Sequence, residues 1–240
     1  MRIGIIAAMP MELKHLVRGW TAVRRLGPNV RAWTSVDAAG DELVAVCAGM
    51  GADAARRAFA VAETDGDLDL VLSIGLAGAL HSELSVGQCS VLSEVIDAKT
   101  GERFTLTEGK RRLRIASTDA VAGPREKQRL WATYGAVMVD MESATVARMA
   151  LQRGIPMCCI KAVSDEADAV LPDVTPFLRD GQLRMLPFLA SMAIRPGAWG
   201  PLLRLGRNSA GAAKSLAAAV DRLLLHKDWA RVNRTGKIEE

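Results

Sequence analysis

The sequence predicts an α/β fold in which one central sheet is flanked by helices. Short apolar runs alternate with helical patterns through most of the chain, and this alternation is typical of α/β architecture. The runs are continuously apolar, which predicts strands covered by helices on both faces. A length of 240 residues suits one large domain. With 50% hydrophobic and 24% charged residues, the composition excludes a disordered or fibrous chain.

The expected strands and helices follow one another along the chain. The strands are Ile3–Ala8, Leu43–Ala48, Leu68–Ile74, Cys89–Ile96, Leu113–Ala116, Val137–Val139 and Met157–Val163. The helices are Ala52–Ala62, Pro124–Tyr134 and Ser143–Arg153. Pro124 suits the first turn of its helix, and Gly154 followed by Pro156 is typical of a helix end.

The chain changes character after Asp168. Prolines punctuate the segment that follows, and residues 202–225 then predict an amphipathic helix that carries arginines. We therefore expect an α/β unit of residues 1–180 and a helical C-terminal appendage of residues 181–240, packed on or beside the same domain. The net charge of +4 is uneven, because residues 1–180 hold 21 basic and 23 acidic side chains, whereas residues 181–240 hold 10 and 4.

A basic extension suits nucleic acid, an anionic membrane surface or an acidic substrate, or is simply a solvated helical face. Few aromatic residues are interleaved with its basic ones, so we expect no nucleic-acid partner. The four cysteines show no CxxC spacing and the three histidines lie far apart. We therefore expect no metal site and reduced thiols in a cytoplasmic protein. No apolar run is long enough to span a bilayer, and we expect no signal peptide.

Two glycine turns follow apolar strands. Residues 49–54 (Gly-Met-Gly-Ala-Asp-Ala) approximate a dinucleotide fingerprint, but the third glycine is replaced by alanine and the strand is not the first of the chain, so a nicotinamide oxidoreductase is a weak alternative. Residues 73–80 form the second turn, at a strand end where open α/β sheets place ligand crevices. Its small residues either admit a ligand or serve packing alone.

Acidic residues end two later strands. Asp140 and Glu142 lie where a strand gives way to a helix, a place where carboxylates often serve only as caps. That interpretation covers Asp140 well and Glu142 less well. Asp165 directly follows a hydrophobic strand, and burial there would favour its neutral, protonated form, which suits a general acid.

These motifs together resemble the purine nucleoside phosphorylase and methylthioadenosine/adenosylhomocysteine nucleosidase superfamily. The matching segments are Gly4–Glu12 (GIIAAMPME), Gly75–Leu80 (GLAGAL), Val139–Glu142 (VDME) and Ser164-Asp165. Their order and spacing agree with that family over residues 1–168. The resemblance implies a mostly mixed, twisted sheet and cleavage of the N-ribosidic bond of an adenine nucleoside, without a cofactor.

Three further segments are similar to the hopanoid-biosynthesis-associated phosphorylases. They are Asp140–Arg148, Ser164–Asp168 and Arg195-Pro196-Gly197 through Leu205. This second resemblance implies a glycosyltransferase that releases adenine from adenosylhopane, with phosphate as co-substrate. The alternatives are a hydrolytic methylthioadenosine or adenosylhomocysteine nucleosidase, a general purine nucleoside phosphorylase, and a nucleotide-sensing binding protein. The family also implies a homo-oligomer.

The resemblance assigns roles to individual residues. Asp165 matches the acid that protonates the purine, and Ser164 orients it by a hydrogen bond. Glu142 matches the carboxylate that takes the ribose hydroxyls and stabilises an oxocarbenium-like transition state. Met141 packs on the apolar face of the ribose, or is simply core.

The nucleophile could be water or phosphate. Glu12 falls at the position of the glutamate that activates water in the nucleosidases. Phosphate would instead lie on an anion loop of Ala8, Gly75, Leu76 and Ala77. The backbone amides of Ala7, Ala8 and Gly75 would bind it, with Arg31 or Arg56 in reach. Leu76 stands where the phosphorylases hold a serine, so the loop residues favour water. The resemblance to the hopanoid-associated phosphorylases favours phosphate, and we therefore expect phosphorolysis.

The C-terminal helix gains a second interpretation from a lipid substrate. Arg204, Arg207, Lys214 and Arg222 beside Leu202, Leu205, Leu223 and Leu224 suit peripheral contact with the inner face of an anionic membrane. The alternative is a terminal helix that packs on its own domain or on a neighbouring subunit.

The base-binding segment provides a first prediction. Val121, next to Ala122, occupies the place of the aromatic residue that stacks on the purine in the nucleosidases. Replacing Val121 with Phe should strengthen binding of plain adenosine by about 0.5–1.5 kcal/mol, because an aromatic face is restored. Titration calorimetry with adenosine tests this, and an unchanged affinity would contradict it.

Overall fold

The computed structural model describes residues 1–23, 27, 29–106, 113–170, 177–179, 182–183 and 199–227. The helices are α1 (Pro10–Leu13), α2 (Ala52–Ala62), α3 (Pro124–Tyr134), α4 (Ser143–Arg153) and α6 (Trp199–His226). The strands are β1 (Arg2–Ala7), β2 (Thr21–Ala22), β3 (Arg31–Val36), β4 (Glu42–Cys47), β5 (Leu70–Ala79), β6 (Cys89–Leu92), β7 (Glu94–Asp97), β8 (Arg103–Thr105), β9 (Arg114–Ser117), β10 (Met138–Asp140), β11 (Met157–Asp165), β12 (Leu178–Arg179) and β13 (Gln182–Leu183).

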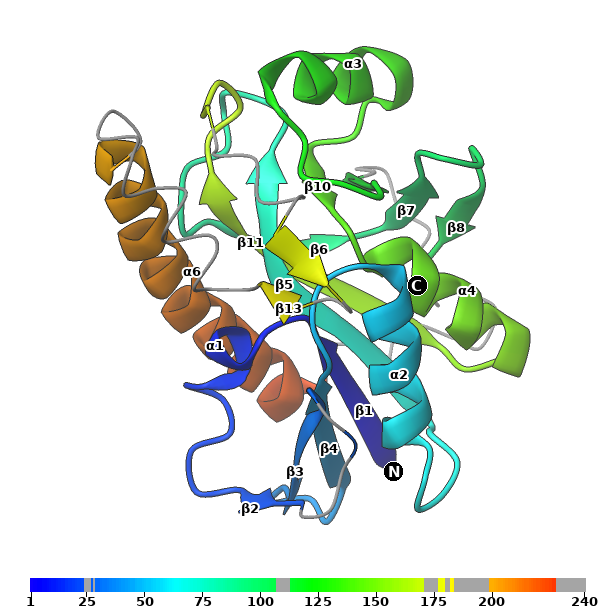
Figure 1. Ribbon diagram of the computed structural model, residues 1–240. Helices are drawn as coiled ribbons and strands as arrows, with labels where there is room; N and C mark the ends of the chain where they lie inside the picture. Colours follow the sequence, from blue (N-terminus) through cyan, green and yellow to red (C-terminus); the bar gives the residue numbers. More distant parts are fainter. Residues whose placement is uncertain are drawn as a thin grey trace.

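One mixed sheet forms the centre of the molecule, with helices on both sides (Figure 1). Its strand order is β2-β3-β4-β1-β5-β10-β9-β7-β8, and β11 joins β5 and β6. Strands β4, β1, β5 and β11 run parallel, whereas β10 is antiparallel to β5 and parallel to β9. This arrangement confirms the predicted mixed α/β fold.

Strand β5 changes its partner half-way along one edge. Residues Leu70–Ser73 pair with β1, whereas Gly78 and Ala79 pair with β10. On the other edge β11 follows β5 from Val71 to Gly78. Gly75 lies within the change and has φ +154°, a conformation that side chains other than glycine rarely adopt. Between Ser73 and Gly78 this edge of β5 therefore pairs with neither β1 nor β10, which leaves an opening at the centre of the sheet.

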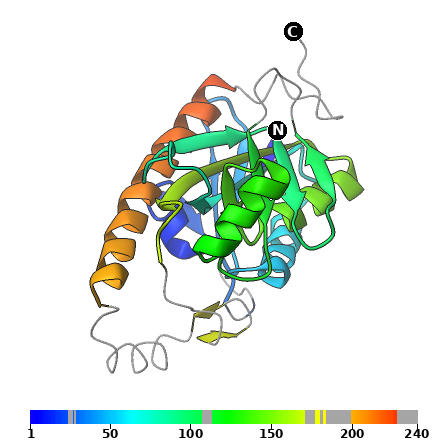
Figure 2. The same ribbon diagram turned by 90° about the horizontal axis from the view of Figure 1, so that it is seen from above.

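Both faces of the sheet are buried, as the continuously apolar runs predicted. Leu70, Leu72 and Ile74 of β5 pack in a core with α6, and Val71 and Ala77 of the same strand pack in a second core with α2 and α4. Successive residues of a strand point to opposite faces. Figure 2 shows the corresponding layers, with α6 on one side of the strands and α2 and α4 on the other.

Helix α6 supplies one of these two cores and is more than an appendage. Ala212, Leu216 and Val220 are fully buried against β5 and β11. Leu223 and Leu224, which the sequence assigned to a membrane face, are also buried, because the sheet needs an apolar cover on this side. The side chain of Leu202 lies outside the described residues.

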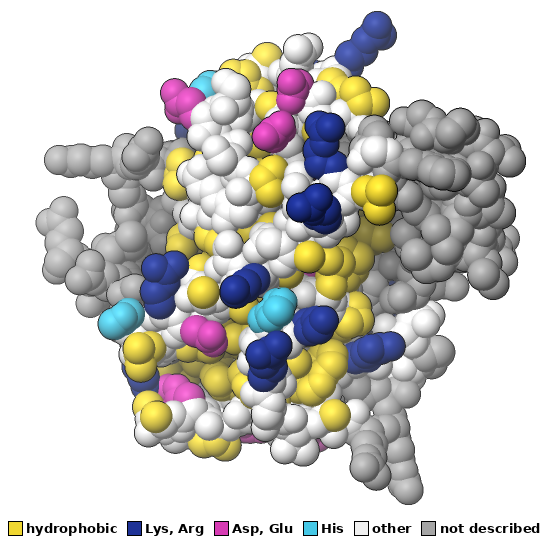
Figure 3. All heavy atoms as spheres, turned by 90° about the vertical axis from the view of Figure 1, so that its left-hand side faces the viewer, with side chains coloured by type: hydrophobic (Ala, Val, Ile, Leu, Met, Phe, Trp, Pro, Cys, Tyr) yellow, Lys and Arg dark blue, Asp and Glu magenta, His cyan; other side chains and the backbone are white. Residues whose placement is uncertain are grey.

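The outer face of α6 is basic. Arg204, Arg207, Lys214 and Arg222 are exposed along it, and Figure 3 shows Lys and Arg side chains outnumbering acidic ones on this side of the molecule. Within the described ranges no helix has the length and apolar character needed to cross a membrane.

Two strand predictions need correction. Strand β3 was not expected, because residues 31–36 mix polar and apolar side chains; it lies near the edge of the sheet, antiparallel to β4, where one side can remain wet. The single strand expected at Cys89–Ile96 is two strands that part at Ser93: β6 pairs with β11, and β7 pairs with β9. Continuous apolar character cannot mark a change of partner.

The packing of α6 can be tested with a matched pair of leucines. Leu216→Ala should lower the free energy of unfolding by about 2–5 kcal/mol, because Leu216 is fully buried between α6 and the sheet. Leu225→Ala is the control, since Leu225 is 75% exposed on the same helix. Urea denaturation measures both. Equal effects would contradict an integral role for α6.

Candidate active site

A cavity of about 250 Å³ lies at the carboxyl ends of β1, β5, β10 and β11, the place where α/β sheets bind ligands. Its lining comes from distant parts of the chain. The residues are Ala8, Met9, Glu12, Met50, Leu76, Ala77, Gly78, Thr118, Ala120, Val121, Ala122, Lys127, Val139, Asp140, Met141, Glu142, Ser164, Asp165, Leu205 and Ser209. The site residues predicted from the sequence thus line one cavity, apart from Gly75 and the two arginines, Arg31 and Arg56. Gly75 lies directly before Leu76 in the cavity wall.

Glu12 lies beside the part of β5 that pairs with neither β1 nor β10. It belongs to the short helix α1, and its Oε2 accepts hydrogen bonds from the N–H groups of Ala8 (2.9 Å) and Met9 (2.7 Å). Its Oε1 accepts one from the N–H of Leu76 (2.9 Å). Burial raises the pKa of Glu12, although these amides and Lys161 oppose the shift. A carboxylate with a raised pKa is a stronger proton acceptor, which suits a general base.

Two backbone amides of the expected anion loop therefore already donate hydrogen bonds to a side chain of the protein. The N–H groups of Ala8 and Leu76 both donate to Glu12. Gly75 leaves room for this carboxylate, because a Cβ there would lie 3.0 Å from Glu12 Oε1. The anion that this loop binds is therefore the Glu12 carboxylate of the protein itself.

Glu142 stands at the N-terminus of α4 and faces the cavity beside Met141. Its Oε1 accepts a hydrogen bond from the N–H of Gly51 (2.7 Å), in the first glycine turn. Burial and the neighbouring Asp140 raise the pKa of Glu142 to about 7, with Lys161 opposing. The first glycine turn thus positions a carboxylate of the cavity.

Asp140 has the structural role that its position suggested. It accepts hydrogen bonds from the hydroxyls of Ser117 (2.6 Å) and Ser143 (2.5 Å) and pairs with Lys161 (2.9 Å). Burial disfavours its ionised form, but Lys161 and these hydroxyls lower the pKa of Asp140 below its usual value. Lys161 is the ammonium that balances the carboxylates at this end of the cavity.

Asp165 ends β11 and is buried, as predicted. The hydroxyl of Ser164 donates to its Oδ1 (2.6 Å), which is the contact that the resemblance implied. The ammonium of Lys127 donates to its Oδ2 (2.5 Å). Asp165 is therefore one half of an ion pair inside the cavity wall.

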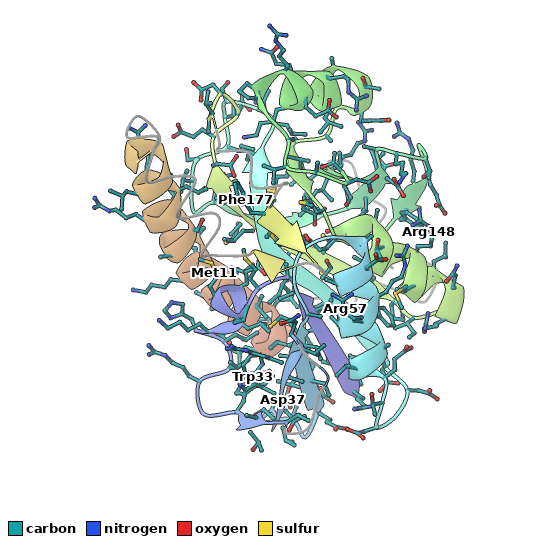
Figure 4. All side chains as sticks on the ribbon, viewed as in Figure 1. Met11, Trp33, Asp37, Arg57, Arg148 and Phe177 are labelled. Atoms are coloured by element: carbon teal, nitrogen blue, oxygen red, sulfur yellow. The ribbon has the colours of Figure 1, made fainter. Side chains whose placement is uncertain are left out.

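The remaining predicted residues divide between the cavity and the surface. Val121 and Ala122 line the cavity after β9. The side chain of Arg56 is 54% exposed and pairs with Asp53. Neither Arg56 nor Arg31 is among the residues that line the cavity. Arg148 binds Asp97 and Glu102 and lies on the side of α4 and β8 (Figure 4). The segment Arg195-Pro196-Gly197 lies outside the described residues. The described residues contain no cluster that could hold a metal ion.

A family model decides what kind of protein this is. The model of the phosphorylase superfamily matches residues 2–122 and 110–186. The chain belongs to the phosphorylase superfamily. Membership makes it an enzyme of the nucleoside phosphorylase and nucleosidase class, and it confirms the resemblance to that superfamily found in the motifs.

Solved structures share the superfamily fold at low sequence identity. The 5′-methylthioadenosine/S-adenosylhomocysteine nucleosidase of Helicobacter pylori with butyl-thio-DADMe-Immucillin-A is 17% identical, with a TM-score of 0.70 over 94% of this chain and 98% of that chain. Futalosine hydrolase of the same organism is 17% identical, with a TM-score of 0.71 over the same shares. The S-adenosylhomocysteine nucleosidase of Streptococcus pyogenes with 5-methylthiotubericidin is 20% identical, with a TM-score of 0.69 over 94% and 97%.

Sequence reasoning missed two buried lysines that pair with carboxylates of the site. Lys161 lies within the apolar strand β11, and Lys127 lies on the same face of α3 as the buried Leu130. A lysine in a buried strand or on the apolar face of a helix is a detectable signal, because it needs a partner for its charge. The partners, Asp140 and Asp165, come from other strands, and only the tertiary structure identifies them.

The raised pKa of Glu142 predicts how stability depends on pH. Its stabilising contribution is fully present below the unfolded pKa of 4.5 and is lost as the pH rises through about 7, because the folded state holds the proton more tightly. Glu142→Gln should therefore raise the free energy of unfolding by about 1–2 kcal/mol at pH 8 and change it little at pH 5. Denaturant titrations at both pH values measure this. The exposed Glu83→Gln is the control, and an equal difference at both pH values would contradict the assignment.

Proposed function

We propose that this enzyme hydrolyses the N-ribosidic bond of an adenine nucleoside that carries a large apolar 5′ substituent, with water as the nucleophile. The observation that carries this proposal is the carboxylate of Glu12 on the amides of Ala8 and Leu76. The Glu12 carboxylate, a proton acceptor, thus occupies the backbone N–H donors that a bound phosphate would need.

Charge also favours water over phosphate. A phosphate on this loop would have to displace Glu12 and would bring its charge beside Glu142. The described lining residues include no arginine, and the two lysines there or beneath, Lys127 and Lys161, are already paired with Asp165 and Asp140. An unpaired dianion in such a site is costly.

The reaction then proceeds by proton transfers at the two ends of the cavity. Oε1 of Glu12 accepts a single hydrogen bond from the described backbone, so a lone pair is left for a proton of the attacking water. The water oxygen bonds to C1′, and the electron pair of the C1′–N9 bond leaves with adenine. Asp165 and the hydroxyl of Ser164 face the leaving base, and a proton delivered there lets adenine depart neutral. Acid or base assistance of this kind typically contributes about a hundred- to ten-thousandfold.

Glu142 is the group that suits the ribose. An ionised carboxylate accepts hydrogen bonds from both ribose hydroxyls and stabilises the positive charge that develops on the sugar. Met141 lies beside it and offers an apolar contact to the sugar face. The N–H of Gly51 keeps Glu142 aimed into the cavity.

The apolar part of the cavity wall favours a substrate with a large 5′ substituent. Met9, Met50 and Leu205 line the cavity together with the acidic groups. A long apolar substituent gains roughly 25 cal/mol per Å² buried, which offsets the stacking lost at Val121. Adenosylhopane, the substrate that the hopanoid resemblance implies, has this character. Methylthioadenosine is the smaller alternative, and phosphorolysis is the rival reaction that the same resemblance implies.

One assay separates these reactions. Adenine release is measured from adenosylhopane, methylthioadenosine and adenosine, each with and without phosphate, and the sugar product is identified. We expect release that ignores phosphate, yields the free sugar and favours adenosylhopane. Phosphate-dependent release with a sugar 1-phosphate as product would overturn hydrolysis.

The proposed roles are tested in the same assay. Glu12→Gln and Asp165→Asn should each lower kcat by about a hundredfold or more, because each removes a proton-transfer group or its partner. Glu83→Gln, in a side chain that is 85% exposed, is the control and should leave kcat unchanged. Full activity of Glu12→Gln would exclude it as the base.

A further inference from the structure

Lys127 presents a buried ammonium group to the cavity at the end that receives the base. It is 1% exposed and lies on α3, outside the sheet. Its Nζ is 2.5 Å from Asp165 Oδ2 and 2.5 Å from the carbonyl oxygen of Glu166. It also belongs to the lining of the cavity itself. A lysine that served packing alone would not need to reach the ligand space.

The hydrogen bonds at this end show which group holds a proton to give. The hydroxyl of Ser164 lies 2.6 Å from Oδ1 of Asp165 and 3.2 Å from the carbonyl oxygen of Ala77, and Oδ2 of Asp165 accepts a hydrogen bond from the ammonium of Lys127. An ammonium has three N–H groups, and the described structure uses two of those on Lys127. The third makes no hydrogen bond to a described residue, and Lys127 is among the residues that line the cavity.

Gly78 makes the approach of this pair possible. A Cβ at this position would lie 3.0 Å from Asp165 Oδ2 and 3.2 Å from Lys127 Cε. Any larger residue would push the ammonium and the carboxylate out of place. The second glycine turn therefore admits the ion pair as well as the ligand.

The pair is complementary to one edge of adenine. That edge offers the N7 acceptor and the N6 amino donor side by side. An ammonium donates to N7 while the neighbouring carboxylate accepts from the amino group. Hypoxanthine has an oxygen in place of the amino group, and that oxygen would face the carboxylate.

We propose that Lys127 is the catalytic proton donor of this site and that Asp165 is the acceptor that holds both Lys127 and the adenine amino group. As the C1′–N9 bond breaks, its electron pair goes to the purine ring, and N7 takes a proton from Nζ. Lys127 is left as a neutral amine, which regains a proton from water after adenine departs. This inference rests on the proposed cleavage of an adenine nucleoside, and it replaces Asp165 as the donor.

Two substrates separate proton donation from a structural role. Adenosine needs a proton on its leaving group, whereas p-nitrophenyl β-D-riboside releases a stable phenolate without one. Lys127→Met and Lys127→Gln should lower kcat for adenosine by about a hundredfold or more and leave cleavage of the p-nitrophenyl riboside nearly unchanged. The glutamine variant keeps a hydrogen bond to Asp165, and thermal melts check that each variant folds.

Lys127→Arg tests the proton itself. Arginine keeps the positive charge but does not give up its proton, so we expect the same loss with adenosine. Arg125→Met is the matched control, because it removes an exposed positive charge from the same helix, and it should change neither rate. Wild-type enzyme should also prefer adenosine over inosine by about tenfold or more.

The outcomes are distinct. Loss of both substrates in the folded Met and Gln variants would make Lys127 structural and overturn the inference, and so would an arginine variant that retains activity on adenosine. If the wild-type enzyme releases adenine from neither adenosylhopane nor adenosine, the proposed function itself fails. Selective loss of adenosine cleavage in all three variants supports Lys127 as the donor.

Discussion

The change of partner along β5 is the constraint on which the site depends. Where β1 ends its pairing at Ser73 and β10 begins at Gly78, the amide of Leu76 is free to bind a side chain. Glu12 fills that place, and the ends of β10 and β11 bring Glu142 and Asp165 to the same opening. A continuous ladder would have used this amide within the sheet and closed the cavity.

Buried charge is the second feature that organises the molecule. Carboxylates at the carboxyl ends of several strands would repel one another in a site with little water. Two ammonium groups offset this repulsion, Lys161 against Asp140 and Lys127 against Asp165. Glu12 and Glu142 have no such direct partner among the described residues and show raised pKa values. Lys161 keeps the pKa of Asp140 below its usual value, whereas burial raises the pKa values of Glu12 and Glu142.

Helix α6 contributes both to the hydrophobic core and to the wall of the cavity. One of its faces covers the sheet through Leu216 and Val220, and its first turns reach the cavity through Leu205 and Ser209. Leu223 and Leu224, two of the leucines that the sequence assigned to a membrane face, are buried by this packing, and the outer face of the helix is basic (Figure 3). An apolar wall for the substrate and a cover for the core are thus two parts of the same helix.

The sequence by itself determined the α/β class, most strands and helices, and the identity of the acidic residues, because continuous apolar runs and residue types at strand ends are local signals. It placed Glu12, Glu142 and Asp165 in one site through motif order alone. It did not reveal strand β3 near the edge of the sheet, the break at Ser93, or the ion pairs that Lys127 and Lys161 form with Asp165 and Asp140. Only the tertiary structure decided that Glu12 occupies the anion loop and that an ammonium lies beside Asp165, because those contacts join residues 64 and 38 positions apart and their energies depend on burial that no local pattern records.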